Sequence, residues 1–328
     1  MTYLLWERGR RRRRPGNPLL IFQLVLIVIF CLTIETLVAP AVQAAKMEGY
    51  PEPSQGLRFS WGGAGVYRFP ARVDGGGTLS VFSLYCSGDV TKQFSEKMGA
   101  GLAFTYDYDD YNFSGLTGFS VPRPWSGVQR LGVSFPVFWA LGEGWRLIVI
   151  PTGQFSGEFG ARFGDALIYG GSIAATYAWG PKLTLGLGVA AYYSLAQVRV
   201  FPYPIVKFTF SDRFRLTNPF RIGPAGPAGL ELTCRLREHW EVGFGGAYRS
   251  YRFRLDYNGP IPNGIGQYSS IPIFARLSYR PSPAFGIDVY GGVSFLNKLY
   301  VEDRNGDELY RTRHRVAPLV GLSMSGNF

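Results

Sequence analysis

The stretch that decides the fold ends the sequence: residues 315–328 read RVAPLVGLSMSGNF. In an extended strand, one face would carry Val316, Pro318, Val320, Leu322, Met324, Gly326 and Phe328. The other face would carry Arg315, Ala317, Leu319, Gly321, Ser323, Ser325 and Asn327. Successive side chains of a strand point to opposite sides of its sheet, so this spacing predicts a strand with one apolar face and one mostly small or polar face.

The same alternation recurs upstream, at 131–139, 228–236, 240–248 and 285–295. In each run large apolar side chains occupy every second position, and the positions between them hold mainly glycine, small residues and a few charges. The sequence has 43 glycines and is 16% aromatic. Aromatic residues suit the outer face of antiparallel strands, and glycine suits a crowded interior. The composition therefore favours an all-β membrane barrel.

Strand-like runs follow one another at hairpin spacing from Leu57 onward. We expect strands near 57–67, 77–87, 98–109, 127–140, 145–156, 166–178, 183–197, 203–210, 214–220, 228–236, 240–255, 269–280, 285–299 and 314–328. The prediction is an antiparallel up-and-down transmembrane β-barrel of about 14 strands. The two short runs at 203–210 and 214–220 leave about 12 strands as the alternative.

Connector lengths support the barrel, because short turns and longer loops alternate along the chain. Transmembrane barrels have short periplasmic turns and long extracellular loops, so an even strand count places both ends of the barrel on the short-turn side. Two connectors depart from this rhythm: 88–97 is long on the short-turn side, and 198–202 is short on the loop side. The competing fold is a secreted β-sandwich, whose polar face would be rich in Lys, Glu, Thr and Ser. Here that face is mainly small, and the strand ends carry Trp139, Trp145, Tyr177, Trp179 and Trp240.

With its apolar alternation and terminal aromatic residue, the last strand resembles the C-terminal insertion signal of bacterial outer-membrane β-barrels, with Phe328 as its closing residue. The chain is also similar to a family of uncharacterised outer-membrane barrels that carry a signal peptide. The matching stretches are 229–232 (GLEL), 251–255 (YRFRL), 302–307 (EDRNGD) and 317–323 (APLVGLS). This resemblance implies a barrel in the cell outer membrane, whose partners are the membrane lipid and the barrel-assembly machinery. It implies no catalytic or ligand-binding residues.

The first 44 residues have the features of a cleaved signal peptide. A basic run ending at Arg14 precedes the apolar stretch 19–30, and small residues surround a cleavage site after Ala44. An uncleaved anchor is the alternative, but the apolar stretch is shorter than a membrane span. We therefore expect a signal peptide at 1–44, a periplasmic lead-in at 45–56 and a barrel domain at 57–328. Cys86 and Cys234 remain after cleavage; a disulfide is possible in an oxidising compartment, but both lie in apolar alternating runs, which favours two separate small hydrophobic residues.

The formal charge of +11 includes the arginines of the leader, and the remaining chain has no Lys/Arg tract. A nucleic-acid partner is therefore not expected. The two histidines, His239 and His314, have no Ser or acidic partner in a recognisable motif, so no catalytic residue is predicted. The acidic stretch 303–308 has its glycine too early for an EF-hand, and a solvated turn explains it better. We predict no metal site, no cofactor and no enzyme.

The remaining chemistry is a set of charges on the small face of the predicted strands. In the register above, six of them point into the lumen: Glu231, Arg235, Glu241, Arg249, Arg276 and Asp288. Such residues either line a pore or close it by pairing. A barrel of this size lies between filled and open barrels, so its size does not decide. The leading hypothesis is a channel for small solutes, among which the net positive charge favours anions. The alternatives are a non-conducting structural or surface-interaction barrel and, third, a barrel enzyme acting on lipid or peptide at the rim.

Overall fold

A computed structural model of the protein describes residues 56–117, 123–219 and 221–328. The predicted signal peptide and residues 45–55 of the predicted lead-in lie outside the described residues. Almost every described element is a β-strand, and the one helical element is a single 3-10 turn. Within the described residues there is no helix of the length and apolarity that a membrane crossing requires.

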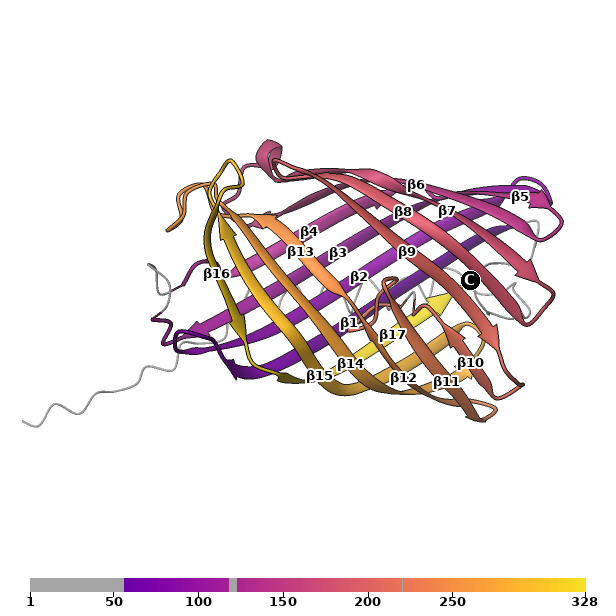
Figure 1. Ribbon diagram of the computed structural model, residues 1–328. Coiled ribbons are helices and arrows are strands. Elements are labelled where there is room, and N and C mark those ends of the chain that lie inside the picture. Colours follow the sequence, from indigo (N-terminus) through magenta and orange to yellow (C-terminus); the bar gives the residue numbers. More distant parts are fainter. Residues whose placement is uncertain (1–55, 118–122, 220) are drawn as a thin grey trace, which may run out of the picture. The chain divides into compact units, whose positions relative to one another are not determined.

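The elements follow one another as a long series of hairpins (Figure 1). Their bounds are β1 (Leu57–Arg72), β2 (Thr78–Gln93), β3 (Met98–Ser114), β4 (Gly127–Ser134), β5 (Val137–Gly142), β6 (Trp145–Glu158), η1 (Phe163–Ala166), β7 (Leu167–Trp179), β8 (Leu183–Ser194), β9 (Val198–Thr209), β10 (Phe214–Thr217), β11 (Gly229–Arg237), β12 (Trp240–Ala247), β13 (Arg249–Arg254), β14 (Ile265–Ser282), β15 (Phe285–Glu302), β16 (Glu308–His314) and β17 (Ala317–Asn327).

In three places, two consecutive elements are the two halves of a single interrupted strand. Counting each such pair as one strand, the described wall is the predicted 14-strand antiparallel barrel. β4 and β5 both pair with β3 and β6, β12 and β13 both pair with β14, and β16 and β17 both pair with β15. Pro136 interrupts the first pair because proline has no N–H for the ladder. At the third break, Leu296 of β15 adopts a φ of 48°, and β15 has one residue more than its other neighbour, β14, at this point.

The sheet closes on itself between its first and last strands. β17 pairs with β1 from Ser60↔Asn327 to Arg68↔Leu319. Beyond this ladder, Phe59 N donates to Phe328 O at 3.0 Å, and Phe328 N donates to Phe59 O at 2.8 Å. Because the sheet is closed, neither terminal strand is left as an open edge. In lipid this is required, since unpaired backbone groups at an edge would have no hydrogen-bond partners.

The connectors divide into a short-turn rim and a long-loop rim. The short-turn rim has the connectors 94–97, 143–144, 180–182, 210–213, 238–239 and 283–284. The long-loop rim has 73–77, the described residues of 115–126, 159–166, 195–197, 255–264 and 303–307, whereas the connector between β10 and β11 does not stay at this rim. The expected long connector at 88–97 was wrong, because β2 continues to Gln93. The short connector at 198–202 was also misplaced: these residues belong to β9, which starts five residues before the predicted 203–210.

The outer face of the wall is apolar. Its exposed side chains include Phe104, Leu131, Ile173, Leu187, Val189, Val200, Leu230, Leu232, Phe244, Leu277, Val289, Val320 and Leu322. Toward the short-turn rim the exposed side chains are aromatic: Trp145, Trp179, Phe210, Phe214, Trp240 and Tyr279. Toward the other rim they include Phe69, Phe159, Phe163, Tyr169 and Tyr193. An apolar band between two aromatic girdles is the outer surface of a membrane-spanning barrel.

The long-loop half of the barrel encloses an aromatic core that alternation alone did not predict. Tyr111 and Trp125 are buried and pack edge to face with ring centroids 5.7 Å apart. Phe253 of β13 lies 5.4 Å from Trp125, and Tyr268 of β14 lies 5.9 Å from Tyr111. Strands far apart around the wall therefore meet inside the barrel.

This meeting occurs because β13 turns into the lumen. At its end, Arg254 forms a parallel bridge with Gly157 of β6, a strand that is not its neighbour in the wall. Ser156 Oγ donates to Arg252 O at 2.8 Å, and Asp256 N donates to Glu158 Oε2 at 2.9 Å. A side chain at Gly157 would crowd Arg254 O, so glycine permits this approach. The interior near the long-loop rim is thus crossed by a strand.

Candidate functional site

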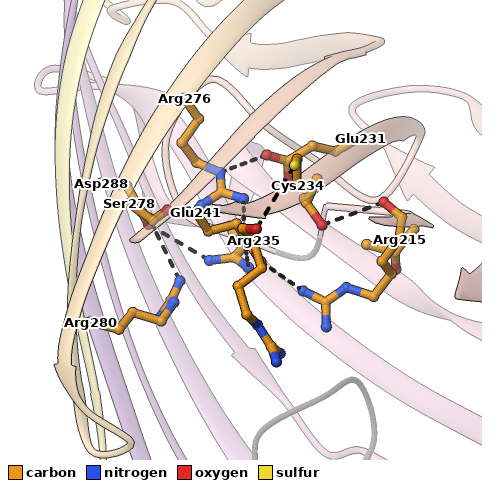
Figure 2. Close-up of polar contacts among 12 residues, drawn as sticks. Arg215, Glu231, Cys234, Arg235, Glu241, Arg276, Ser278, Arg280 and Asp288 are labelled. Atoms are coloured by element: carbon orange, nitrogen blue, oxygen red, sulfur yellow. Dashed lines mark hydrogen bonds and ion pairs between the residues drawn. The ribbon is translucent and has the colours of Figure 1, made fainter. Parts of the chain in front are cut away.

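The charges of the short-turn half converge on Arg276 of β14. Its Nε lies 2.6 Å from Glu231 Oε1 of β11, and its Nη2 lies 2.7 Å from Glu241 Oε1 of β12. Its Nη1 lies 3.1 Å from Asp288 Oδ1 of β15. Figure 2 shows the guanidinium reaching toward these acids from the inner face of the wall. The Arg276 cluster, comprising these four residues, therefore binds four strands together.

Local sequence makes the cluster fit. Antiparallel register places Gly243 opposite both Thr233 of β11 and Arg276 of β14. A Cβ at Gly243 would collide with the Glu231 carboxylate, so glycine on β12 leaves the space through which Glu231 and Arg276 meet. Ser323 of β17 adds a hydroxyl that donates to Asp288 Oδ2 at 3.2 Å.

Three more arginines surround the cluster. Arg215 Nη2 of β10 lies 3.3 Å from Glu241 Oε2, and Arg280 Nη2 of β14 lies 3.6 Å from Asp288 Oδ1. Arg221, from the β10–β11 connector, lies 3.8 Å from both Glu241 and Asp288. Three carboxylates thus face four guanidinium groups, which leaves positive charge on this part of the inner wall.

The six charges expected in the lumen occupy three places. Four form the Arg276 cluster. Arg235 is exposed near the short-turn end of β11, on the same face of that strand as Glu231. Arg249 lies further toward the long-loop rim, where its Nη1 donates to Gly223 O at 2.9 Å and also to Ala225 O.

The hydrogen bonds of Arg249 show that the connector after β10 enters the lumen, where the sequence predicted an external loop. Gly223, Pro224, Ala225 and Gly226 are buried. Ile222 lies over Gly62 of β1, where a Cβ would touch its Cδ1. Residues 221–227 separate the strands expected at 214–220 and 228–236, and the alternation of short turns and long loops predicted an external loop there. That prediction was wrong, because this segment crosses from β10 to the opposite wall. We call 221–228 the luminal segment.

One sequence signal could have located the luminal segment. β10 is only four residues long, so β9 pairs with it only from Lys207 to Thr209. The rest of β9 carries Pro202 and Pro204, which are typical of a strand with a free edge. Asn218 compensates part of that edge, since its Oδ1 accepts from Val206 N at 2.7 Å and its Nδ2 donates to Pro204 O at 3.0 Å.

A second charged cluster lies on β1 to β4. Arg130 Nη1 is 2.7 Å from Asp109 Oδ2, and Arg130 Nε is 3.4 Å from Asp107 Oδ2. Asp109 also accepts from Ser83 Oγ at 2.5 Å, and Ser83 accepts from Arg68 Nη1 at 2.9 Å. Two arginines thus face two carboxylates, so the cluster is balanced in charge and ties the four strands together, while Arg68 Nε and Arg130 Nη2 remain buried without a hydrogen-bond partner among the described residues.

The luminal segment leaves a cavity of about 380 Å³ between itself and the wall. The segment forms one side, β2 and β3 form another, and β13 forms the third. Tyr85 and Tyr251 bring aromatic rings to the cavity, and Ser87 and Thr105 bring hydroxyl groups. Arg249 brings a guanidinium group whose carbon lies 5.4 Å from the Tyr85 ring centroid and 5.1 Å from that of Tyr251.

The groups considered for catalysis or metal binding are occupied by structural bonds. His314 is buried, with Nε2 3.1 Å from Tyr268 Oη and Nδ1 2.9 Å from Arg315 O. Asp303 Oδ1 accepts from Asn305 N at 2.8 Å and Asp307 N at 2.9 Å. These bonds from the backbone lower the pKa of the Asp303 carboxyl. The described residues contain no cluster of metal-binding side chains, and no disulfide joins Cys86 to Cys234.

Comparison with known families gives one match. The model of the family described as Domain of unknown function (DUF6268) matches residues 125–327, more than half of the chain. The chain belongs to this family. All four stretches that carry the resemblance noted in the sequence lie inside the matched residues. No curated protein has a matching sequence.

Several solved structures are similar to the chain. The COG4313 outer membrane channel from Pseudomonas putida F1 is 10% identical with a TM-score of 0.45, over 88% of this chain and 100% of that one. A Pseudomonas aeruginosa FadL homologue is 13% identical with a TM-score of 0.40, over 83% and 89% of the two chains. The NanC porin is 11% identical with a TM-score of 0.36, over 81% and 98%.

Proposed function

We propose that this protein is an outer-membrane barrel that passes small anionic solutes. The proposal joins three features: the apolar band between aromatic girdles, the closed wall, and an inner surface at the short-turn end that is rich in cations. Signal-directed export and insertion by the barrel-assembly machinery, guided by Phe328, belong to the same proposal.

The inner charge is the observation that carries the proposal. Register places basic side chains on the inner face near the short-turn rim at Arg58, Arg146, Lys207, Arg215 and Arg235, and the contact with Asp288 places Arg280 there too. Asp89, which accepts from Ser60 Oγ at 3.3 Å, is the acid on the same face of β2. The three acids of the Arg276 cluster lie in the same region, where they pair with Arg276, Arg215, Arg221 and Arg280, so cations still outnumber carboxylates on this part of the inner wall. Fixed cations along a pore wall raise the local concentration of anions and repel cations.

Planar-bilayer recording of the purified full-length protein tests the proposal. A KCl gradient across the bilayer should give a reversal potential of the sign set by chloride. The double variant Arg146→Gln/Lys207→Gln should move it toward zero, because both side chains belong to the inner cationic wall. Gln replacement of Arg311, which lies at the long-loop rim in an exposed pair with Glu308, should leave the potential unchanged. A reversal potential of the sign set by potassium would refute anion selectivity.

A non-conducting structural barrel is the second candidate, and a specific observation favours it. The luminal segment and the aromatic core both occupy the bore, and β13 crosses it to β6. The same recordings decide between the two. An inserted barrel that gives no current at any voltage would support the structural function and exclude passage of small ions.

A further inference from the structure

The cavity beside the luminal segment has the properties of a ligand site. Its volume of about 380 Å³ lies within the range of small-molecule pockets. It is lined by elements that lie far apart in the sequence: β2, β3, the luminal segment and β13. A solute that passes from one rim to the other must pass this constriction, because the luminal segment reaches from β10 to Gly62 on the opposite wall.

Most of the cavity lining is apolar. Ile222, Ala225 and Pro227 of the luminal segment line it together with the aromatic residues Tyr85 and Tyr251. A lining of apolar and aromatic side chains favours a flat organic molecule over a hydrated inorganic ion, because the ion would lose bound water without gaining polar partners.

Arg249 supplies the specific polar group. Its Nη1 is engaged by two carbonyl oxygens of the luminal segment, at Gly223 and Ala225. No group among the described residues accepts a hydrogen bond from its Nε or Nη2. Two donors of a guanidinium in fixed geometry match the two oxygens of a carboxylate. Asp107, the acid on the cavity wall, is already paired with Arg130 at 3.4 Å.

Hydroxyl groups complete the lining. Ser87 and Thr105 come from neighbouring positions of β2 and β3, opposite each other in the register, so their hydroxyls lie on one wall of the cavity. The Tyr251 hydroxyl is buried and has no hydrogen-bond partner among the described residues. A buried polar group without a partner is costly, and a polar substituent on a bound molecule would satisfy it.

We propose that this cavity binds small aromatic carboxylates, with the carboxylate on Arg249 and the ring between Tyr85 and Tyr251. The proposal rests on the proposed function, since it names the class of anion that the pathway selects. The hydroxyls of Ser87, Thr105 and Tyr251 then receive a ring substituent, and the luminal segment holds Arg249 in place.

Benzoate is the probe. Titrated into the bath, it should block the chloride current in a saturable manner. Acetate, which lacks the ring, and benzyl alcohol, which lacks the carboxylate, should block far more weakly. Arg249→Lys keeps the charge but loses the paired donors, and should weaken the block about tenfold, the loss expected for one charged hydrogen bond. Arg311→Gln, in the exposed pair at the long-loop rim and outside the cavity lining, should retain it.

Arg249→Lys could also weaken the block indirectly, because Arg249 holds the luminal segment in place. A second variant that leaves these bonds intact separates the two effects. Ser87→Leu fills the cavity from β2 without touching the bonds of Arg249, and should abolish the block while the barrel still folds. Equal block in the native protein, Arg249→Lys and Ser87→Leu would overturn the proposal. So would equal block by benzoate and acetate.

Binding can also be measured without any current. Isothermal titration calorimetry of benzoate against the detergent-solubilised full-length protein should give a saturable heat of binding. Ser87→Leu should remove this heat. A barrel that conducts with anion selectivity but gives no such heat retains the proposed function and loses this site. A barrel that binds benzoate but passes no current retains the site and loses the channel.

Discussion

Arg130 of β4 lies over the ring of Tyr251 of β13, with its guanidinium carbon 4.0 Å from the ring centroid. The two strands are not neighbours in the wall, because β13 pairs with β14 and β4 pairs with β3 and β6. The contact therefore joins the charged cluster of β1 to β4 to the strand that crosses the lumen. It fixes β13 in its inward position together with the bridge from Arg254 to Gly157.

Replacing Tyr251 with leucine tests this contact. Leucine keeps apolar volume but removes the ring face, so we expect a loss of about 0.5–2 kcal/mol in the free energy of unfolding, as for a desolvated cation–π pair. Urea unfolding in lipid vesicles, followed by tryptophan fluorescence, measures it. Tyr257→Leu is the matched control: Arg162 lies 3.4 Å from its ring centroid, but the ring is exposed at the rim. An equal loss in both variants would contradict the special role of β13.

Removing the charge of Arg276 should cost much more. Arg276→Gln leaves Glu231, Glu241 and Asp288 close together without their shared cation, and breaking a buried ion pair from one side costs about 3–5 kcal/mol. The urea midpoint should fall accordingly. Arg311→Gln removes an exposed ion pair, formed 2.5 Å from Glu308 Oε2, and should cost less than about 1 kcal/mol. A midpoint for Arg276→Gln as high as that of Arg311→Gln would mean that the cluster contributes little to stability.

The Arg276 cluster also shows what alternation along a sequence can predict. Glu231, Glu241 and Asp288 occupy the small-residue face of their strands, and a period of two places every such residue on one side of the sheet. Neighbouring antiparallel strands then bring the charges together, so a local pattern suffices to find them. The number of strands and the closure of the sheet follow from the same pattern.

The luminal segment and the inward turn of β13 follow from contacts that no local pattern contains. Ile222 is placed by Gly62, and Arg254 by Gly157, in pairs that are distant in the sequence. Each contact needs a glycine at the receiving strand, but glycine is common throughout this chain and marks no particular position. The aromatic residues of the core, such as Tyr111, lie on the inner face, where alternation leads one to expect small residues.

The turn at Asp303 should resist acid. Bonds from the amides of Asn305 and Asp307 favour the ionised carboxyl, so its pKa is lower in the folded protein than the ordinary value of 3.8. The contribution of a group with a lowered pKa is present above its unfolded value and is lost only as the pH falls through the folded value. Amide hydrogen exchange at 303–307 should therefore show unchanged protection as the pH falls to 3.8, after correction for the intrinsic rate.

The matched variants separate hydrogen bonding from charge and from cation binding. Asp303→Asn keeps an oxygen acceptor and should retain most of the protection, whereas Asp303→Ala should lose it. Added Ca²⁺ should change neither result, because the Asp303 oxygen is already occupied by backbone amides. If Ca²⁺ raises the protection in the native protein but not in Asp303→Ala, the stretch 303–308 binds a cation, and its interpretation as a solvated turn is wrong.

Deleting Phe328 should reduce insertion more than it reduces the stability of the inserted barrel. Phe328 contributes two backbone bonds to Phe59 at the seam between β1 and β17, and the ladder from Ser60 to Arg68 continues without it. The seam loses only its last pair, so a folded barrel should keep nearly its full urea midpoint. If the terminal aromatic residue is read during assembly, the deletion should nevertheless leave less protein in the heat-modifiable form on gels of the outer-membrane fraction. Phe328→Tyr, which keeps the ring and both backbone bonds, should restore it. Full insertion of the deletion variant would remove the assembly role and leave Phe328 as an ordinary strand end.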